Sequence, residues 1–262
     1  MQYIIGLLLA AFIFIFSLFG KHLTLFGAIF ISAFILLPVF FNLWEVLILF
    51  LGSFIFLMVV DKVTRKKRKV INSNILEKSG PRTVRQVLSN GFCALLSVIL
   101  FILTENNLFM ITYLISIGQT IADSTASDIG ILSKHAPIDI CTRKQILSGL
   151  SGGISFLGTI TSSIACAVYG ITVYFLMNIT VFETLIIVLL SMFGNIIDSI
   201  LGSRLQVKYQ CGVCNTITEK KSHCGLETAH IRGLRIIDNC MVNFICNCTV
   251  CLIGACVILI RG

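Results

Sequence analysis

The sequence predicts an all-α, polytopic helical membrane protein with about eight transmembrane helices. Of its 262 residues, 56% are hydrophobic and only 12% are charged, whereas soluble proteins average about 25% charged residues. The mean hydropathy is +0.98. Apolar runs close to the roughly 20 residues that a bilayer requires recur along the whole chain. The composition therefore excludes an ordinary soluble domain.

Eight apolar runs mark the expected helices in chain order. The first run has no basic residues before it and is followed by Lys21, so we expect a retained helix rather than a cleaved signal peptide. The fifth run is the shortest, and it ends in polar residues. The runs cover residues 2–20, 23–41, 43–60, 87–103, 108–122, 154–176, 181–197 and 241–260.

The distribution of charge predicts the topology, because Lys and Arg are retained on the cytoplasmic side. With eight helices, the loops 61–90, 123–150 and 198–239 lie on one side together with Lys21, and every basic residue except Arg261 is there. We therefore expect both termini on the non-cytosolic side. All the aspartates accompany the basic loops and face the cytosol, where nucleotides are found: Asp61, Asp123, Asp128, Asp139, Asp198 and Asp238.

The net charge of +8 would suggest nucleic-acid binding in a soluble domain. Here the main basic run, residues 62–69, directly follows a span, so we interpret it as a topology determinant attracted to anionic lipid headgroups. A phosphate-handling role for this run is the alternative. We expect the lipid bilayer, and no nucleic acid, as a partner. Most of the eleven cysteines fall in predicted cytosolic loops or the last helix, where thiols stay reduced.

The chain divides into three expected regions. Residues 1–60 form the N-terminal transmembrane helices, and residues 61–80 form a basic cytosolic linker. Residues 81–262 form a transmembrane core that bears the motifs, with a cytosolic Cys/His loop at 204–238. No internal repeat of solenoid period is visible. We expect the chemistry to reside in the core.

The first motif spans residues 123–130, at the cytosolic end of the fifth run. On a helix, Asp123 and Ser127 share a face, and Asp128 lies about 140° further round. A carboxylate at this depth is energetically costly and usually belongs to a site. Mg²⁺ is held by one or two carboxylates plus substrate phosphates, so we expect Asp123 as a Mg²⁺ ligand. The alternative is a helix cap or a structural hydrogen bond.

The second motif is glycine-rich, spans residues 149–158 and opens the sixth run. Glycines at a helix start permit close backbone approach, and the free N–H groups there bind anions. Arg143 or Lys144 would complete the charge around a phosphate. The motif is not a Walker A loop, because it lacks the Gly-Lys-Ser/Thr ending. Tight packing of small residues explains it equally well. The candidate phosphate-binding residues here are Gly149, Gly152, Gly153 and Ser155.

The third motif spans residues 194–202, at the cytosolic end of the seventh run. Asp198 and Gly202 lie one helical turn apart, so the carboxylate faces a gap without a side chain. Such a gap can admit a phosphate or another helix. We expect Asp198 to bind Mg²⁺ and nearby Arg204 to bind phosphate.

The fourth motif enters the last run. Asn239 and Asn243 lie one turn apart and present two amides on one face, so we expect them, together with Ser127 of the first motif, to bind substrate or phosphate. Asp238, just before them, is a candidate site residue and equally an ordinary helix N-cap.

A set of soft metal ligands lies between the third and fourth motifs. Cys211 and Cys214 are separated by two residues, and His223 and Cys224 follow. This pattern is typical of a zinc site. The alternative is a cysteine-bearing loop without metal.

In this order, the motifs resemble the family called domain of unknown function 92, which includes transmembrane protein 19 and plant phytyl-phosphate kinase. Residues 82–91, Arg-Thr-Val-Arg-Gln-Val-Leu-Ser-Asn-Gly, are similar to the family's Arg-Asn-x-x-Gln-Val-Leu-Ala-Asn-Gly. The similarity continues through all four motifs and the Cys/His loop. The family's Trp is Thr125 here, its Glu is Asp128, and the proline usual before the glycine-rich stretch is missing.

The resemblance implies an integral membrane kinase that transfers a phosphoryl group from CTP or another nucleoside triphosphate to an isoprenyl monophosphate. It implies Mg²⁺ as cofactor and leaves open an endomembrane or a plastid-type membrane. We expect Asp123, Asp128, Asp198 and Asp238 to act on metal or nucleotide. Two alternatives remain: a transporter or flippase whose aspartates bind a coupling ion, and a non-catalytic membrane scaffold.

Overall fold

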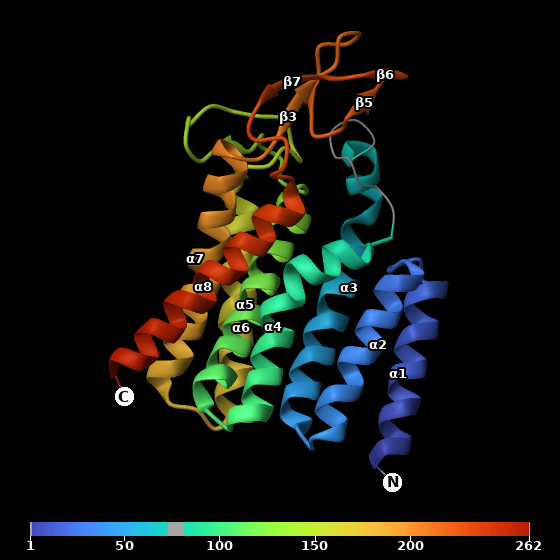
Figure 1. Ribbon diagram of the computed structural model, residues 1–262. Helices are drawn as coiled ribbons and strands as arrows, with labels where there is room; N and C mark the ends of the chain where they lie inside the picture. Colours follow the sequence, from blue (N-terminus) through green and yellow to red (C-terminus); the bar gives the residue numbers. More distant parts are fainter. Residues whose placement is uncertain (1, 73–80, 262) are drawn as a thin grey trace.

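The computed structural model describes residues 2–72 and 81–261, and within them eight helices stand side by side as a bundle (Figure 1). The predicted all-α, eight-helix architecture is confirmed. The helices are α1 (Gln2–Phe19), α2 (Leu25–Phe40), α3 (Trp44–Asn72), α4 (Val84–Thr104), α5 (Asn107–Gly130), α6 (Phe156–Met177), α7 (Val181–Arg204) and α8 (Asn239–Arg261).

Short strands, which the sequence did not predict, lie in the two loops at one end of the bundle. The α5–α6 loop contains an antiparallel pair, and the α7–α8 loop contains a three-stranded sheet of order β4-β3-β7 and a separate β5-β6 hairpin. The strands are β1 (Ile138–Asp139), β2 (Gly153–Ile154), β3 (Lys208–Gln210), β4 (Ile217–Thr218), β5 (Ser222–His223), β6 (Leu226–Glu227) and β7 (Ala229–Arg232).

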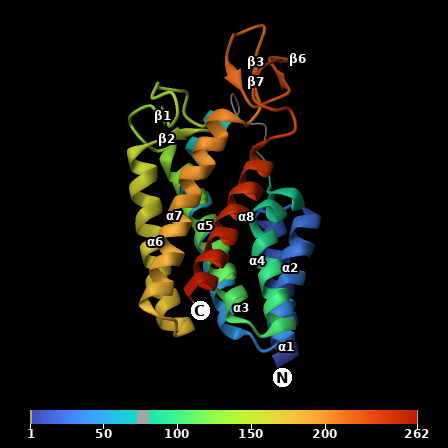
Figure 2. The ribbon, with the colours of Figure 1, turned by 60° about the vertical axis from the view of Figure 1, so that its left-hand side comes forward.

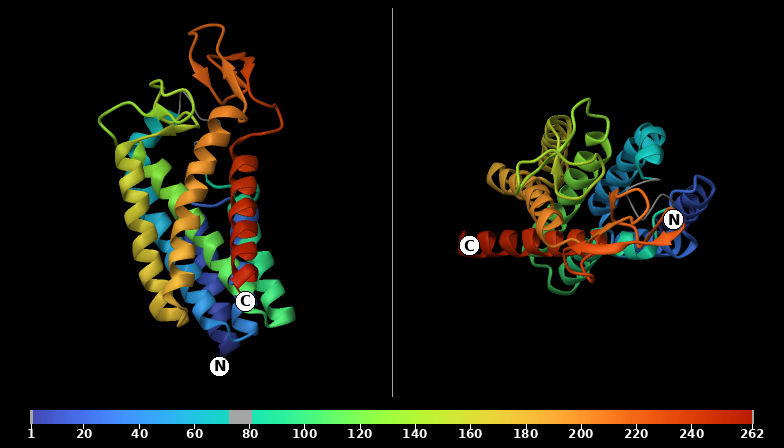
Figure 3. Two further views of the ribbon diagram at one scale, coloured as in Figure 1. Left: turned by 90° about the vertical axis from the view of Figure 1, so that its left-hand side faces the viewer. Right: turned by 90° about the horizontal axis from the view of Figure 1, so that it is seen from above.

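Both ends of the described chain lie at the end of the bundle opposite to these strands (Figure 2). The α5–α6 and α7–α8 loops, which carry predicted cytosolic basic residues, share the strand end (Figure 3). This arrangement agrees with the expected topology, because the loops that carry these basic residues lie at the same end of the bundle.

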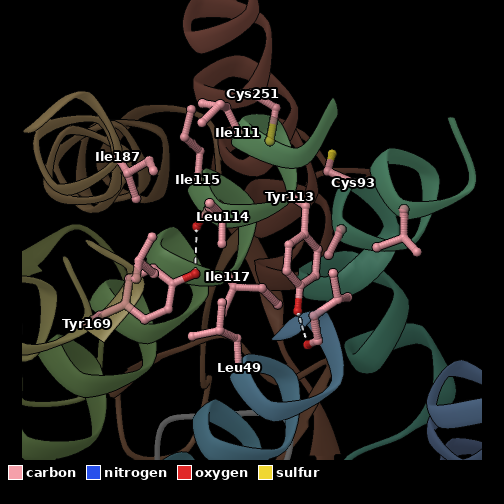
Figure 4. Close-up of a cluster of buried hydrophobic side chains, with 14 of the residues drawn as sticks. Leu49, Cys93, Ile111, Tyr113, Leu114, Ile115, Ile117, Tyr169, Ile187 and Cys251 are labelled. Atoms are coloured by element: carbon pink, nitrogen blue, oxygen red, sulfur yellow. Dashed lines mark hydrogen bonds between the residues drawn. The ribbon is translucent and has the colours of Figure 1, made fainter. Parts of the chain in front are cut away.

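Helix α5 lies at the centre of the bundle, packed against α3, α4, α6, α7 and α8. It extends beyond the predicted run 108–122 and carries the first motif within its last turns. Two tyrosines fix its position, as Figure 4 shows. Tyr113 donates to the carbonyl of Val46 on α3 at 2.8 Å, and Tyr169 of α6 donates to the carbonyl of Leu114 at 3.0 Å.

Six of the described helices are long and apolar enough to cross a membrane by length and composition, whereas α2 is shorter. Helix α5 is long enough but carries many polar residues. Because neighbouring helices cover it on nearly every side, it does not need an apolar surface. Hydropathy alone therefore fails to identify α5 as a membrane span.

The N-terminal helices form an apolar cluster of their own, with Ile13, Ile31, Ile35 and Val39 buried between α1, α2 and α3. Helix α3 does not end at residue 60 as predicted but continues to Asn72, because Lys and Arg are good helix formers. The start of the predicted linker is therefore helical. Residues 73–80 lie outside the described part, and the side chains of the basic run are described only to residue 65.

The turn between α1 and α2 pairs with the backbone that precedes α4. The Arg82 N–H donates to the carbonyl of His22 at 2.8 Å, and the Thr24 N–H donates to the carbonyl of Arg82 at 3.0 Å. Thr83 then caps α4 through a capping box with Gln86. The turn between the first two helices is thus joined by hydrogen bonds to Arg82, the first residue of the motif 82–91.

Asp139 anchors the α5–α6 loop to the end of α7. Its buried carboxylate accepts hydrogen bonds from the N–H groups of Cys141 and Thr142 and from the hydroxyl of Ser203 at 2.8 Å. Burial alone would raise the pKa of Asp139, but these hydrogen bonds outweigh it and lower that pKa. We conclude that this predicted cytosolic aspartate is structural.

Candidate functional site

A polar cavity of about 280 Å³ opens at the strand end of the bundle, and all four motifs line it. Its volume is close to the lower end for ligand sites, about 300–1,000 Å³. Its lining includes every predicted catalytic aspartate and most of the predicted phosphate-binding residues, namely Asp123, Ser127, Asp128, Gly149, Gly152, Gly153, Ser155, Asp198, Asp238, Asn239 and Asn243.

Asn243 brings Asp123 and Asp198 together at the floor of this cavity. One of its two amide positions lies 2.8 Å from Asn90 Oδ1 and 3.5 Å from Asp123 Oδ2. The other position, with nitrogen placed there, donates to Asp198 Oδ2 at 3.1 Å. A single amide therefore lies between carboxylates on α5 and α7, and in either orientation its nitrogen donates to only one of them. Among the described residues, no salt bridge within 4.0 Å involves either of these two aspartates.

The other two aspartates of the cavity are paired with arginines of the motif 82–91. Asp128 lies 3.8 Å from Arg82, and Asp238 forms a two-pronged pair with Arg85 at 2.6 and 3.2 Å. Asp238 also accepts from the N–H of Met241 at 3.1 Å, which is the geometry of a helix N-cap. The capping interpretation of Asp238 is therefore correct, and the same residue lines the cavity.

Most of the glycine-rich motif, residues 149–155, forms a loop before α6, which begins at Phe156. Gly152 has a φ of +88° and packs on Ser203, where a Cβ would approach the α7 backbone to 2.5 Å. At Gly158 a Cβ would lie 2.6 Å from the carbonyl of Ala126 on α5. Ser155 caps α6 through the N–H of Gly158 at 3.1 Å. Small-residue packing thus explains Gly152 and Gly158, while the loop between them lines the cavity.

Gly202 on α7 faces this loop. A Cβ there would lie 2.9 Å from the backbone nitrogen of Gly152. The gap expected beside Asp198 is therefore occupied by the glycine-rich loop and admits neither a phosphate nor another helix.

Two side chains of the β3–β4 hairpin hold the glycine-rich loop from above. Ser151 donates its N–H to Glu219 Oε1 at 2.9 Å and accepts from Lys208 Nζ at 2.8 Å. Burial lowers the pKa of Lys208, and the nearby Glu219 carboxylate acts in the opposite direction. Glu219 and Gln206 line the cavity, and the Gln206 Oε1 atom is buried without a hydrogen-bond partner among the described residues.

The structure does not bring the three predicted phosphate-binding bases to the cavity. Arg143 and Lys144 are exposed on the turn that follows β1, where Arg143 has a φ of +57°. Arg204 is exposed at the end of α7 and does not line the cavity. Among the described lining residues the basic one is Arg82. Arg82, Gln86 and Asn90 all belong to the motif 82–91, which carried the resemblance but was not predicted to line the site. Glu219 was not predicted either.

A second cavity of about 100 Å³ adjoins the first and is almost entirely apolar. Phenylalanines of α2 and α3, including Phe34 and Phe50, form much of its wall. It shares Arg82, Gln86 and Asn90 with the polar cavity. These three polar side chains therefore form a wall that is common to both cavities.

The four predicted zinc ligands converge in the α7–α8 loop. The ligand atoms of Cys211, Cys214, His223 and Cys224 all lie within 4.8 Å of one another. They form a group, here called the Cys/His cluster, that is separate from the polar cavity, since none of them lines it. Within the described part of the chain, no other group of three or more potential ligands is this close together.

The fold and the site define a polytopic membrane protein whose helices end in a polar cavity rich in carboxylates. The chain belongs to the family described as integral membrane protein DUF92, which it matches over residues 8–251. The resemblance inferred from the motifs is therefore confirmed.

Two relatives cover most of the chain. It is 31% identical over 182 residues to "Uncharacterized membrane protein MJ0933" of Methanocaldococcus jannaschii, spanning 68% of this chain and 71% of that protein. It is 30% identical over 220 residues to "Protein PGR" of Arabidopsis thaliana, spanning 73% and 75%. No solved structure matches the chain.

Proposed function

We propose that the protein is a membrane prenyl-phosphate kinase, which transfers a phosphoryl group from CTP or another nucleoside triphosphate to an isoprenyl monophosphate. The observation that carries the proposal is that Arg82, Gln86 and Asn90 line both the polar and the apolar cavity. An amphiphile can place its phosphate in the polar cavity and the start of its chain in the apolar one. Its tail would continue between the helices into the bilayer.

Asp123 and Asp198 are the residues that suit Mg²⁺. They lack salt-bridge partners among the described residues, and a pair of charges left in that state near a membrane is costly. Mg²⁺ typically takes one or two carboxylates and completes its coordination with water and substrate phosphates. Bound there, it would neutralise charge on the nucleotide phosphates. The Asn243 amide lies between the two carboxylates and donates to one of them.

The remaining roles follow from charge and position. Phosphoryl transfer requires mainly the alignment of two phosphates and positive charge around them. Arg82 would bind a phosphate through its planar guanidinium, which suits phosphate oxygens. Asp128, 3.8 Å away, orients that guanidinium. The glycine-rich loop, fixed by Gly152 and Ser151, forms the opposite wall.

A transporter in which the same aspartates bind a coupling ion is the competing function. Transporter sites usually lie near the middle of the bilayer. Asp123 and Asp198 instead lie toward the strand end of α5 and α7, beside loops open to the aqueous phase. This placement favours chemistry on a soluble nucleotide.

The test uses purified protein in detergent with Mg²⁺ and labelled CTP or ATP. Phytyl, geranylgeranyl and farnesyl monophosphate serve as acceptors. We expect a labelled prenyl diphosphate from the wild type, and a rate at least about 100-fold lower for Asp198→Asn, as when one electrostatic stabiliser is removed. Asp61→Asn is the matched control, because Asp61 pairs with Arg65 on α3 and does not line the cavity.

Absence of product with every nucleotide and acceptor, from folded protein, would overturn the kinase proposal. In that case, ion-coupled flux through proteoliposomes that Asp198→Asn abolishes would establish the transporter. A folded protein with neither activity would favour the scaffold.

A further inference from the structure

We propose that Cys211, Cys214, His223 and Cys224 bind one structural Zn²⁺, which fixes the hairpin that holds the glycine-rich loop in place. The proposal is independent of the kinase reaction. It rests on the ligand geometry, on the two turns that present the ligands, and on the contacts that run from these turns to Ser151.

The distances between the ligand atoms match a tetrahedral zinc site. Zn–S bonds of about 2.3 Å place two thiolates of a tetrahedron about 3.8 Å apart. Cys214 Sγ and Cys224 Sγ lie 3.8 Å apart. His223 Nδ1 lies 3.4 Å from Cys214 Sγ and 3.2 Å from Cys224 Sγ. The histidine thus presents Nδ1 to the same point as the thiolates.

Two tight turns aim the ligands at this point. In the first turn, Cys211 precedes Asn215, whose φ of +57° reverses the chain, and the Val213 N–H donates to Cys211 Sγ at 3.4 Å. Such N–H donors stabilise a metal-bound thiolate. In the second, Cys224 and Gly225 have φ values of +53° and +80°, which is the two-residue turn of a tight hairpin between β5 and β6.

The site is structural rather than catalytic. Four protein ligands complete the coordination of Zn²⁺, whereas catalytic zinc keeps a position open for water or substrate. The β5–β6 hairpin also stands above the helices, at the far end from both termini (Figure 1). The cluster is separate from the polar cavity, because its ligands are not among the residues that line it.

The strands beside the cluster are too short to form a large hydrophobic core of their own. The module contains strands of two to four residues, and structures of this size usually need a metal or disulfides. Cys211 directly follows β3, which begins with Lys208, and Glu219 directly follows β4. These two side chains contact Ser151 at 2.8 and 2.9 Å. Zinc therefore stabilises the hairpin whose ends bind the glycine-rich loop.

The first test is the metal content of the purified full-length protein in detergent, measured by inductively coupled plasma mass spectrometry. We expect about one zinc per chain in the wild type and in Cys256→Ser, which alters an exposed cysteine of α8. We expect loss of the zinc in Cys214→Ser. Wild type without zinc, Cys214→Ser with full zinc, or a Cys214–Cys224 disulfide in the intact protein would each overturn the site.

The second test concerns the role of the metal and uses the wild type, so that it does not depend on the folding of a variant. Zinc is removed with a chelator, and amide hydrogen exchange is followed in the peptide that contains Ser151. We expect at least about tenfold faster exchange of that peptide. Exchange in the C-terminal half of α6, far from the glycine-rich loop, should remain unchanged. Glu219→Ala should retain zinc and accelerate exchange at the same peptide. Unchanged exchange after zinc loss would overturn the bracing role.

Discussion

Helices α1 and α5 show how differently two spans of one bundle are built. Helix α1 has apolar residues on nearly all sides, and large ones such as Leu8 and Phe12 are more than 60% exposed, as expected for contact with lipid. Helix α5 is buried on nearly every side and carries Ser116, Gln119 and Asp123. Hydropathy therefore reports mainly the lipid-facing surface of a helix, and α5, which carries part of the site, is not among the six helices that qualify as spans by length and composition.

The interior of the bundle also contains a polar network that has no counterpart among the described side chains between α1 and α2. Asn247 of α8 donates to Gln119 Oε1 at 3.0 Å, and Ser116 donates to Asn247 Oδ1 at 2.7 Å. Between α1 and α2, by contrast, the described side-chain hydrogen bond is from Ser32 to the carbonyl of Ala10, at 3.2 Å. Asn247 is the shared partner of Ser116 and Gln119, and these hydrogen bonds lower the cost of burying polar side chains in the interior.

The largest effect is expected from a larger side chain at a closely packed glycine of the interior. A Cβ at Gly194 would lie 2.5 Å from Gln119 and 3.2 Å from Val250, so Gly194→Leu should destabilise the protein by about 3 kcal/mol. At Gly52 of α3 nothing lies within 4 Å of such a Cβ, so Gly52→Leu should have almost no effect. Detergent-induced unfolding of the two variants measures the difference. Equal losses would show that the two regions are packed alike.

A smaller loss is expected from breaking the polar network. Asn247→Leu leaves Ser116 and Gln119 without their partner, and unsatisfied buried groups cost about 1–3 kcal/mol. Ser32→Ala in the outer pair removes one hydrogen bond, for which about 0.6 kcal/mol is typical in membranes. The same unfolding assay compares them. If Ser32→Ala destabilised the protein more than Asn247→Leu, the contrast between interior and exterior would fail.

A further step down is Tyr169→Phe, which removes the hydrogen bond from α6 to the Leu114 carbonyl. That carbonyl lies inside α5 and keeps its helical partner, so we expect a loss of only about 0.6 kcal/mol. A loss above about 2 kcal/mol would mean that the tyrosine hydroxyl supports more of the core than this single contact.

The smallest effect is expected on the lipid-facing surface. Leu8→Ile conserves volume at a position that is 66% exposed. The free energy of unfolding, measured by the same assay, should therefore change by less than about 0.5 kcal/mol. A larger change would indicate that α1 packs against another protein surface at this position.

The sequence predicted the helices well because apolar length is a local property. It also identified Asp123, Asp198 and Asn243, which the structure brings together from α5, α7 and α8. It failed for the phosphate-binding bases, since proximity along the chain suggested Arg143 and Lys144, whereas folding exposes both and brings Arg82 to the cavity. The short strands were missed because segments of two to four residues carry no periodic pattern. The contacts of Lys208 and Glu219 with Ser151 were missed because they join residues that lie far apart in the sequence.

The hydrogen bonds between the α1–α2 turn and Arg82 give the outermost helices a role beyond anchoring. The turn forms hydrogen bonds with both the N–H and the carbonyl of Arg82. It therefore positions the backbone from which the Arg82 side chain extends to the polar cavity. A core grafted onto an unrelated membrane anchor would retain all four aspartates yet lose the fixed position of its cation. The least polar part of the chain thus determines where the cavity carries its positive charge.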